Sequence, residues 1–439
     1  MGLKTKIGRL LATFRPDENL KNGLEFLATN EFHKAREIFK IIIEKSNSLK
    51  SKKTALAGLA ATHMSFHNCG AEKSSEAIQS LKYATSVLPN EEDFWLALGD
   101  CWLDVKVSDF DRGDECKKAF QKVIQLNQSS ADAYYGLGML NQHLGDMQDA
   151  RVCYERALDL RPGHATAAFR LWLLEGEPEK IKRNLYDYYD KEKTKTIIEI
   201  QMDSNRPLTP LELEAIRKTQ KYGTVIFRQG IPSASISDLK KQTVEFATKY
   251  EFKKNTSIPF EDAPDELRKK IDEVIQKEIF QKIMPKVSFW SEKGWQSMPN
   301  PAKWIQYFPP KTGRATPFHL DHPVVCQESD WTTFWVALTD SGPGVAPSLG
   351  ICRIPLYEPI DCEEQNIGRI NPVPISKIMD FFGDAMVRPS FRAGDVACFG
   401  RYMLHCTVFD EAMKQERLSF DFRYVTGPAR FSGVFAQFY

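Results

Sequence analysis

Two histidines and one aspartate lie within four positions of the stretch TPFHLDHPVV, residues 316–325. His319 and Asp321 are separated by one residue, so on an extended chain their side chains point to the same side. Taken alone, this stretch fits a metal site, an acid–base pair, or a polar turn that leads into a strand. We expect His322 to lie at the surface or behind the other two rather than to act as a ligand.

A metal site would need a third ligand, and a candidate lies far along the chain. The segment PSFRAGDVACFGRYMLHCTVFD turns at AGD into a predicted strand that ends near His405. Two histidines and one carboxylate on one face of a metal ion leave three coordination positions open, which is the facial triad of non-haem Fe(II) oxygenases. Two of these positions can chelate a 2-oxo acid, and the third can take O2.

A 2-oxo acid with a second carboxylate also needs a fixed cation. Arginine suits this task because its planar fork binds a carboxylate through two hydrogen bonds. Arg417 lies twelve residues after His405, and Thr407 lies two residues after it, where its hydroxyl can donate a further hydrogen bond. Arg423 shares a predicted strand face with Arg417 and stays the alternative cation.

Residues 417–425, RLSFDFRYV, alternate between polar and apolar side chains, which is typical of a strand. The apolar face holds Leu418, Phe420, Phe422 and Tyr424, and the polar face holds Arg417, Ser419, Asp421 and Arg423. Such a strand suits a barrel wall that packs on helices outside and faces a polar cavity inside. With further strand-like runs at 302–308, 331–340 and 395–400, it predicts a double-stranded β-helix (a jelly-roll barrel) supported by helices.

The C-terminal half resembles the phytanoyl-CoA dioxygenase-like branch of the Fe(II)/2-oxoglutarate oxygenases. The segments YGTVIFRQGI, PFHLDH, FWVALTD, AGDVACFGRYMLHCT and RLSFDFRY match the family and follow its order. The resemblance implies that His319, Asp321 and His405 bind Fe(II). It also implies that Arg417 and Thr407 bind the cosubstrate 2-oxoglutarate, with O2 as the oxidant.

This resemblance extends over about 207–430 and has two departures. The interval from the distal histidine to Arg417 is slightly longer than is usual in the family, which keeps Arg423 as the alternative. Residues 341–356, SGPGVAPSLGICRIPL, replace an acidic, glycine-rich segment, so the acyl-CoA substrate of the family is not carried over. The presence of Asp321 argues against a halogenase, because halogenases have a small residue in place of this carboxylate.

The N-terminal third has a helical repeat instead. Residues 131–164 closely resemble a tetratricopeptide repeat, with Gly138 and Ala150 placed where two antiparallel helices must approach each other. Weaker copies lie upstream and give about four repeats over 19–164, and residues 165–176 are predicted to form a capping helix. Such a solenoid can bind a peptide or a protein, or it can brace the neighbouring domain or mediate dimerisation.

These patterns divide the chain into four parts. We predict an N-terminal segment at 1–18, tetratricopeptide repeats with a capping helix at 19–176, a linker or connecting helix at 177–206, and an oxygenase-like domain at 207–439. The predicted fold class is therefore α + β and multidomain, with an all-α solenoid followed by a jelly-roll barrel.

The predicted function is Fe(II)- and 2-oxoglutarate-dependent hydroxylation of a substrate that the sequence does not identify. The repeats would recruit a protein, a peptide or a carrier-bound substrate. Alternatively, the enzyme hydroxylates a lipid, an amino acid or a natural product, and the repeats serve dimerisation or partner binding. A third hypothesis is a scaffold without catalysis, in which the barrel only binds. The sequence does not predict the oligomeric state.

The composition narrows the range of partners and compartments. With 59 Lys and Arg against 58 Asp and Glu, the net charge of +1 gives no support to nucleic-acid binding. Nine scattered cysteines without a C-x-x-C pair favour a reducing compartment over a disulfide framework. No apolar run is long enough to cross a membrane, and the start lacks the apolar core of a secretory signal, so we expect a cytoplasmic protein.

Overall fold

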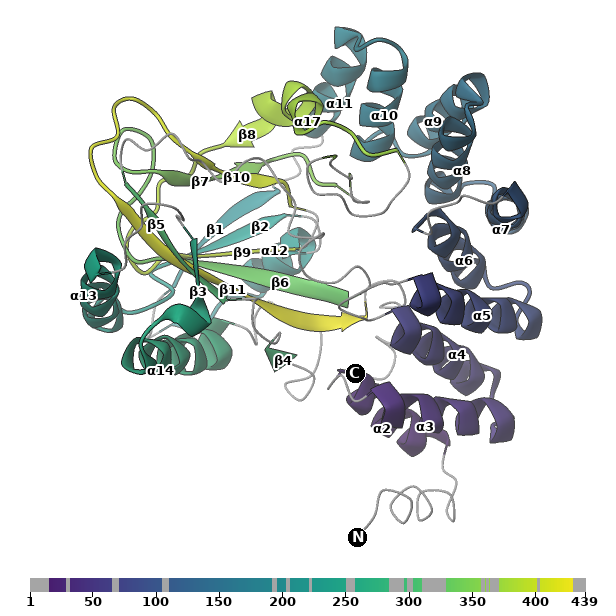
Figure 1. Cartoon of the computed structure of the whole chain (residues 1–439), viewed down its shortest axis with the longest axis horizontal. Helices are drawn as coiled ribbons and strands as arrows, with labels where there is room; N and C mark the ends of the chain where they lie inside the picture. Colours follow the sequence, from purple (N-terminus) through teal and green to yellow (C-terminus); the bar gives the residue numbers. More distant parts are fainter. Residues whose placement is uncertain are drawn as a thin grey trace.

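The chain forms a curved array of helices followed by a β domain, so the predicted fold class is confirmed (Figure 1). The computed structural model describes residues 16–28, 32–64, 71–104, 110–191, 196–202, 206–220, 223–249, 257–283, 296–297, 303–309, 329–356, 360, 363, 371–400 and 403–428. Within these residues, no helix has both the length and the apolar character needed to cross a lipid bilayer.

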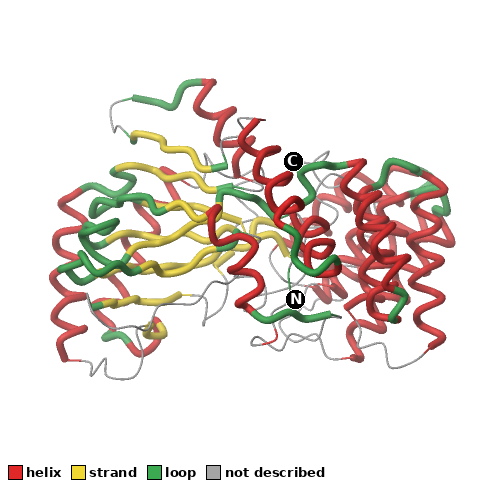
Figure 2. Tube along the Cα trace, turned by 90° about the horizontal axis from the view of Figure 1, so that it is seen from above, coloured by secondary structure: helices red, strands yellow, loops and turns green. Residues whose placement is uncertain are grey.

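The helices of the array pack against their neighbours in chain order. Figure 2 shows a group of helices beside the strands of the β domain. They are α2 (Pro16–Ala28), α3 (Phe32–Lys45), α4 (Leu49–Met64), α5 (Ala71–Val87), α6 (Glu92–Asp104), α7 (Phe110–Leu126), α8 (Ala131–Leu144), α9 (Met147–Leu160), α10 (Ala165–Leu174) and α11 (Glu179–Lys191). The closest approaches require glycine. A Cβ on Gly58 would lie 2.4 Å from the ring of Phe39, and one on Gly138 would lie 2.5 Å from the ring of Tyr154. The second contact joins α8 to α9 where the repeat pattern predicts it.

The β domain contains two sheets. The larger has the strand order β1-β2-β9-β6-β11-β5-β3 with β4 beside β11, and the smaller has the order β10-β7-β8. The strands are β1 (Ile197–Gln201), β2 (Thr224–Arg228), β3 (Ser257–Pro259), β4 (Gln296–Ser297), β5 (Lys303–Phe308), β6 (Ser329–Ala337), β7 (Ser348–Cys352), β8 (Met386–Val387), β9 (Val396–Gly400), β10 (His405–Val408) and β11 (Arg417–Pro428). Side chains from both sheets share an inner core, as a jelly roll requires.

The segment predicted as a linker or connecting helix, residues 177–206, contributes to both parts of the molecule. It holds α11 and also β1, which pairs in parallel with β2. Ile198 and Ile200 on β1 are buried in the outer core of the larger sheet, whereas Glu199 between them is exposed. A short strand with a central charge is hard to tell from a linker by sequence, because its partner strand supplies the burial.

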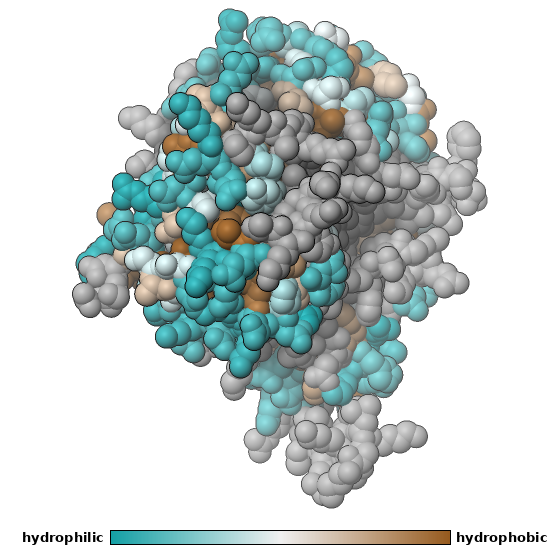
Figure 3. All heavy atoms as spheres, turned by 60° about the vertical axis from the view of Figure 1, so that its left-hand side comes forward, coloured by the Kyte–Doolittle hydropathy of each residue, from teal (hydrophilic) through white to brown (hydrophobic). Residues whose placement is uncertain are grey.

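Helices cover the outer face of the larger sheet. They are α12 (Pro210–Gln220), α13 (Ser233–Lys249), α14 (Asp265–Val274) and a π-helical segment, η2 (Ile275–Ile283). Their apolar side chains share a core with strand residues such as Phe334 and Phe422, whose rings stack at 5.1 Å. The surface on the side where α13 and α14 lie is mainly hydrophilic, with small separate hydrophobic spots (Figure 3).

The last two helices of the array pack on the β domain. Both α10 and α11 share a hydrophobic core with α17 (Ile375–Phe382). The rings of Phe169 on α10 and Phe381 on α17 lie 5.4 Å apart. Beside this core, Lys182 Nζ on α11 donates to Asp384 Oδ2 at 2.6 Å. The predicted capping helix is therefore covered by the β domain and followed by another helix, rather than facing solvent.

Strand β11 has the two faces that its alternation predicts. Leu418, Phe420 and Phe422 belong to the outer core, whereas Arg417 and Asp421 line the space between the sheets. The polar face is buried as well, since Arg417 is 1% exposed and Asp421 is 3% exposed. Burying a charged group costs free energy unless it is paired or hydrogen-bonded. The groups around Arg417 and Asp421 therefore need to be identified.

Candidate active site

A polar cavity lies between the two sheets. Its lining residues are Gln306, Thr333, Trp335, Leu349, Phe399, His405, Cys406, Thr407, Arg417, Asp421 and Arg423. The structure thus brings together three of the predicted site residues, His405, Thr407 and Arg417, with the alternative cation Arg423. They come from β10 and β11, which belong to different sheets.

Arg417 lies beside two aromatic rings. Its guanidinium carbon lies 4.1 Å from the ring centre of Phe308 and 5.6 Å from that of Trp335. Nη2 donates to Gln306 Oε1 at 2.8 Å and to Thr407 Oγ1 at 3.4 Å, while Nε and Nη1 have no hydrogen-bond partner in the described part of the chain. Burial lowers the pKa of Arg417 to about 9, so the group is cationic at neutral pH.

Arg423 lies in a different electrostatic setting. Its Nη1 donates to Asp421 Oδ2 at 2.6 Å, and both side chains are buried. Gln306 Nε2 donates to the other oxygen of Asp421 at 2.6 Å, so the amide of Gln306 links this ion pair to Arg417. Arg423 therefore has a carboxylate partner, whereas the hydrogen bonds of Arg417 within the described residues all go to neutral groups.

His405 and Thr407 lie on β10, opposite Ile351 and Leu349 of β7. His405 Nδ1 lies 2.9 Å from the carbonyl oxygen of Met403. A carbonyl only accepts hydrogen bonds, so Nδ1 carries a proton, and in the neutral form of the ring the lone pair lies on Nε2. This tautomer suits a metal ligand, which binds through one ring nitrogen while the other donates to a fixed acceptor.

The other two predicted metal ligands, His319 and Asp321, lie outside the described residues. Among the residues that are described, no group of three or more His, Cys, Asp and Glu is placed to hold a metal ion. Cys406 also lines the cavity, and burial raises the pKa of its thiol to about 11. Among the described residues that line the cavity, His405 is therefore the one predicted metal ligand, and the buried cation Arg417 lines the same cavity.

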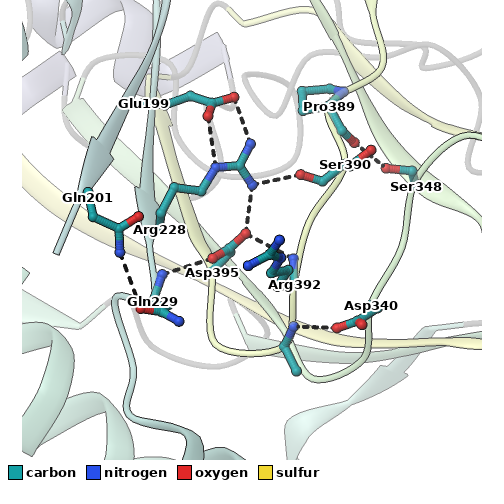
Figure 4. A network of polar contacts seen from close by, with 11 residues as sticks. Glu199, Gln201, Arg228, Gln229, Asp340, Ser348, Pro389, Ser390, Arg392 and Asp395 are labelled. Carbon is teal, nitrogen blue, oxygen red and sulfur yellow. Dashed lines mark hydrogen bonds and ion pairs between the residues drawn. The ribbon is translucent and has the colours of Figure 1, made fainter.

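A second polar network braces the cavity wall from the side of β1. Arg228 donates through Nε and Nη2 to the two oxygens of Glu199, at 3.0 and 2.6 Å, and through Nη1 to Asp395 Oδ2 at 2.6 Å (Figure 4). Asp395 is 1% exposed and also accepts from the backbone N–H groups of Gln229 and Arg392. Asp395 therefore holds the turn before β9 and also fixes the guanidinium of Arg228.

Two lining residues have functions that the sequence did not predict. Gln306 hydrogen-bonds to both Arg417 and Asp421. Trp335 is 2% exposed, as a core residue would be, but it also contacts Arg417. Both depend on the pairing of β11 with β5 and β6, which places Gln306 opposite Ser419 across more than a hundred residues of chain.

Comparison with protein families matches residues 131–164 to the tetratricopeptide repeat, which confirms the repeat predicted there. Comparison with curated proteins gives no match. Comparison with solved structures gives matches that each cover part of this chain.

MamA shows 22% identity and a TM-score of 0.31, over 39% of this chain and 94% of MamA. EvdO2 from Micromonospora carbonacea var. aurantiaca, solved with 2-oxoglutarate, shows 14% identity and a TM-score of 0.37, over 51% of this chain and 93% of EvdO2. SnoK, a non-heme alpha-ketoglutarate-dependent carbocyclase from nogalamycin biosynthesis, shows 16% identity and a TM-score of 0.36, over 50% of this chain and 84% of SnoK. At this identity the likeness concerns only the arrangement of helices and strands.

Proposed function

We propose that the protein is an Fe(II)- and 2-oxoglutarate-dependent oxygenase. In this proposal His319, Asp321 and His405 hold the metal, and Arg417 with Thr407 binds the C5 carboxylate of 2-oxoglutarate. When bound, the metal and the cosubstrate supply the oxidising power, with O2, to hydroxylate a C–H bond of the substrate.

The observation that carries the proposal is the surroundings of Arg417. It is a buried cation whose two hydrogen-bond acceptors among the described residues, Gln306 Oε1 and Thr407 Oγ1, are neutral. A buried charge of this kind is costly unless an anion completes the site. A ligand carboxylate would provide that anion and would accept hydrogen bonds from Nε and Nη1, the donors that have no partner among the described residues. This supports Arg417 over Arg423, because Asp421 already balances the charge of Arg423.

The chain's own side chains prepare the site in three ways. Phe308 and Trp335 enclose the guanidinium and exclude water, which strengthens a charge-assisted hydrogen bond. The hydroxyl of Thr407, beside Nη2, can donate to the same carboxylate. The carbonyl of Met403 fixes the proton of His405 on Nδ1, which leaves Nε2 for the metal.

A matched pair of substitutions tests the anion site. Arg417→Gln removes the cation, and we expect the apparent KM for 2-oxoglutarate to rise by about tenfold or more, with metal binding unchanged. Arg423→Gln keeps a donor for Asp421 and should change this KM much less. Succinate formation at varied 2-oxoglutarate gives both values. A larger rise in KM for Arg423→Gln than for Arg417→Gln would show that Arg423, not Arg417, binds the cosubstrate.

The proposed metal ligands have a separate test. His319→Ala and Asp321→Ala should abolish succinate formation, while the thermal unfolding midpoint stays close to that of the unmodified protein. Metal content after gel filtration shows whether the loss of activity follows the loss of metal. Full activity in either variant would exclude that residue as a ligand.

For the helical array we propose the recruitment of a protein, a peptide or a carrier-bound substrate, which would raise the concentration of substrate near the metal. One observation favours a second function, bracing of the barrel. The shared core of α10, α11 and α17 joins the end of the array to the β domain. Binding of the substrate by a purified array, once a substrate is known, would separate recruitment from bracing.

A further inference from the structure

A continuous row of guanidinium and aromatic groups crosses the inner face of the larger sheet. The guanidinium carbon of Arg228 lies 5.7 Å from the ring centre of Phe391, and the rings of Phe391 and Trp335 are 4.7 Å apart. The row ends at Arg417, 5.6 Å from Trp335. These are contact distances for cation–π and aromatic pairs. We call these four residues the arginine–aromatic row.

The first end of the row is held firmly. Arg228 donates two hydrogen bonds to Glu199 on β1, one to Asp395 before β9, and one to the carbonyl oxygen of Ser390 at 2.6 Å (Figure 4). A planar guanidinium that is bonded on both edges has little freedom to rotate or to shift. Its position is therefore set by β1, β2 and the turn that leads into β9.

The two aromatic rings in the middle of the row, Phe391 and Trp335, connect Arg228 to Arg417. Phe391 and Trp335 are both 2% exposed and belong to the inner core. The backbone of Phe391 exchanges two hydrogen bonds with Ser341, at 2.9 and 2.8 Å. In a close-packed interior a ring held in this way cannot move without disturbing its neighbour, so the place of Phe391 determines the place of Trp335.

The other end of the row depends on its neighbours. Among the described residues, Arg417 makes one short hydrogen bond, to Gln306, and one long one, to Thr407. With so few hydrogen bonds, the position of its guanidinium depends on packing against the two neighbouring rings, Phe308 and Trp335.

We propose that Arg228 is a positioning residue for the 2-oxoglutarate site, which acts through Phe391 and Trp335 to fix the guanidinium of Arg417. The proposal rests on the proposed function of Arg417. A guanidinium grips a carboxylate best when the two groups are coplanar, so a tilt of Arg417 weakens binding although no donor is lost. The anchor Glu199 lies on β1, directly after α11, so the end of the helical array leads into this row.

Calorimetric titration of the metal-loaded full chain with 2-oxoglutarate tests the row. Phe391→Leu removes a ring but keeps an apolar side chain, and we expect Kd to rise about threefold. Glu199→Gln weakens the anchor and should raise Kd less. The matched control is Glu212→Gln, because Glu212 accepts two hydrogen bonds from Arg206 at 2.9 Å each but lies on α12, outside the row. It should leave Kd unchanged.

A double variant separates the row from two independent effects. If both residues act through one row, Glu199→Gln in the Phe391→Leu background should add little to Kd. Losses that multiply would contradict a common row. A lower unfolding midpoint with an unchanged Kd would mean that the row is only structural, and would overturn the proposal.

A second readout does not depend on 2-oxoglutarate. In protein with 15N-labelled arginine, the Nε–H resonance of Arg417 lies under the ring currents of Phe308 and Trp335, and Arg417→Met identifies it by its loss. Phe391→Leu should shift this resonance, and Glu212→Gln should not. A resonance that stays in place overturns the positioning role. Absence of 2-oxoglutarate binding in the unmodified protein would instead overturn the proposed function, and the resonance would still decide whether the row positions Arg417.

Discussion

The two faces of the larger sheet are both buried, yet they carry opposite kinds of side chain. The outer face presents Phe334 and Phe422 to a core shared with helices. The inner face presents Arg417 and Asp421, which are as enclosed as the phenylalanines. Burial of apolar rings stabilises the fold, whereas burial of charges costs free energy that hydrogen bonds only partly offset. The outer face therefore stabilises the fold, and this stabilisation offsets the free energy that it costs to bury the charged groups of the candidate binding site on the inner face.

The largest expected effect comes from breaking both faces at once. A chain that begins at Pro207 loses β1, which supplies Ile198 and Ile200 to the outer core and Glu199 to the inner face. It also loses α10 and α11, which cover α17. We expect such a chain to show no cooperative thermal unfolding transition by circular dichroism.

The matched control begins at Ala131 and keeps α8 to α11 together with β1. It should retain a cooperative transition. If the chain from Pro207 also folds and binds metal, the array is a separate domain after all, and its effect on substrate use can then be measured directly.

A change on the outer face should affect stability and leave binding intact. Phe334→Ala removes a fully buried ring that stacks on Phe422, and such deletions cost about 3–5 kcal/mol of unfolding free energy. Urea unfolding gives this loss. At a temperature where the variant is folded, its Kd for 2-oxoglutarate should equal that of the unmodified protein. A weaker Kd would mean that the two faces are not separable.

The opposite result is expected on the inner face. Arg417→Met replaces a buried cation by an apolar side chain of similar length, which is often neutral or stabilising. We expect the unfolding midpoint to stay or to rise, while 2-oxoglutarate binding weakens by about tenfold or more. A large loss of stability would show that Arg417 supports the fold. It would contradict the view that the inner face serves binding while the outer face provides stability.

Much of this arrangement can be predicted from sequence where a pattern is local. The alternation over 417–423 identifies both faces of β11, and the spacing within 131–164 identifies the repeat. His405, Thr407 and Arg417 also come together, because two of them share one strand and the family resemblance indicates the third. The signal lies within one strand for the faces of β11 and within one helix pair for the repeat, whereas the link between β10 and Arg417 depends on the family resemblance.

The remaining features depend on contacts between distant segments. Glu199 looks like a charge in a linker until Arg228, 29 residues away, pairs with it. Gln306 acquires its place from a pairing with β11, and nothing around it in sequence distinguishes a cavity from solvent. The sequence predicts α10, which holds Phe169, as a capping helix at the end of the array. Only the tertiary fold shows that α17 covers this residue.

The smallest expected effect comes from changing threonine to valine at two positions, one that lines the cavity and one that does not. Thr407 Oγ1 lies 3.4 Å from Arg417 Nη2, inside the cavity. Thr407→Val keeps the shape of the side chain but loses the hydroxyl that would meet the carboxylate. A weak hydrogen bond of this kind is worth about 0.5–1.5 kcal/mol, so Kd for 2-oxoglutarate should rise about two- to tenfold with little change in the unfolding midpoint.

Thr339→Val is the counterpart in the wall of the domain. Thr339 Oγ1 accepts a hydrogen bond from the backbone N–H of Leu418 at 2.9 Å, and this donor is buried. Loss of the acceptor leaves it unpaired, which costs about 1–3 kcal/mol of stability. Kd for 2-oxoglutarate should stay unchanged, because Thr339 does not line the cavity. The same change of hydroxyl to methyl should thus weaken binding at Thr407 and folding at Thr339. If the two variants changed Kd and stability equally, loss of the hydroxyl would act through general packing. The effect would then not depend on whether the threonine lines the cavity.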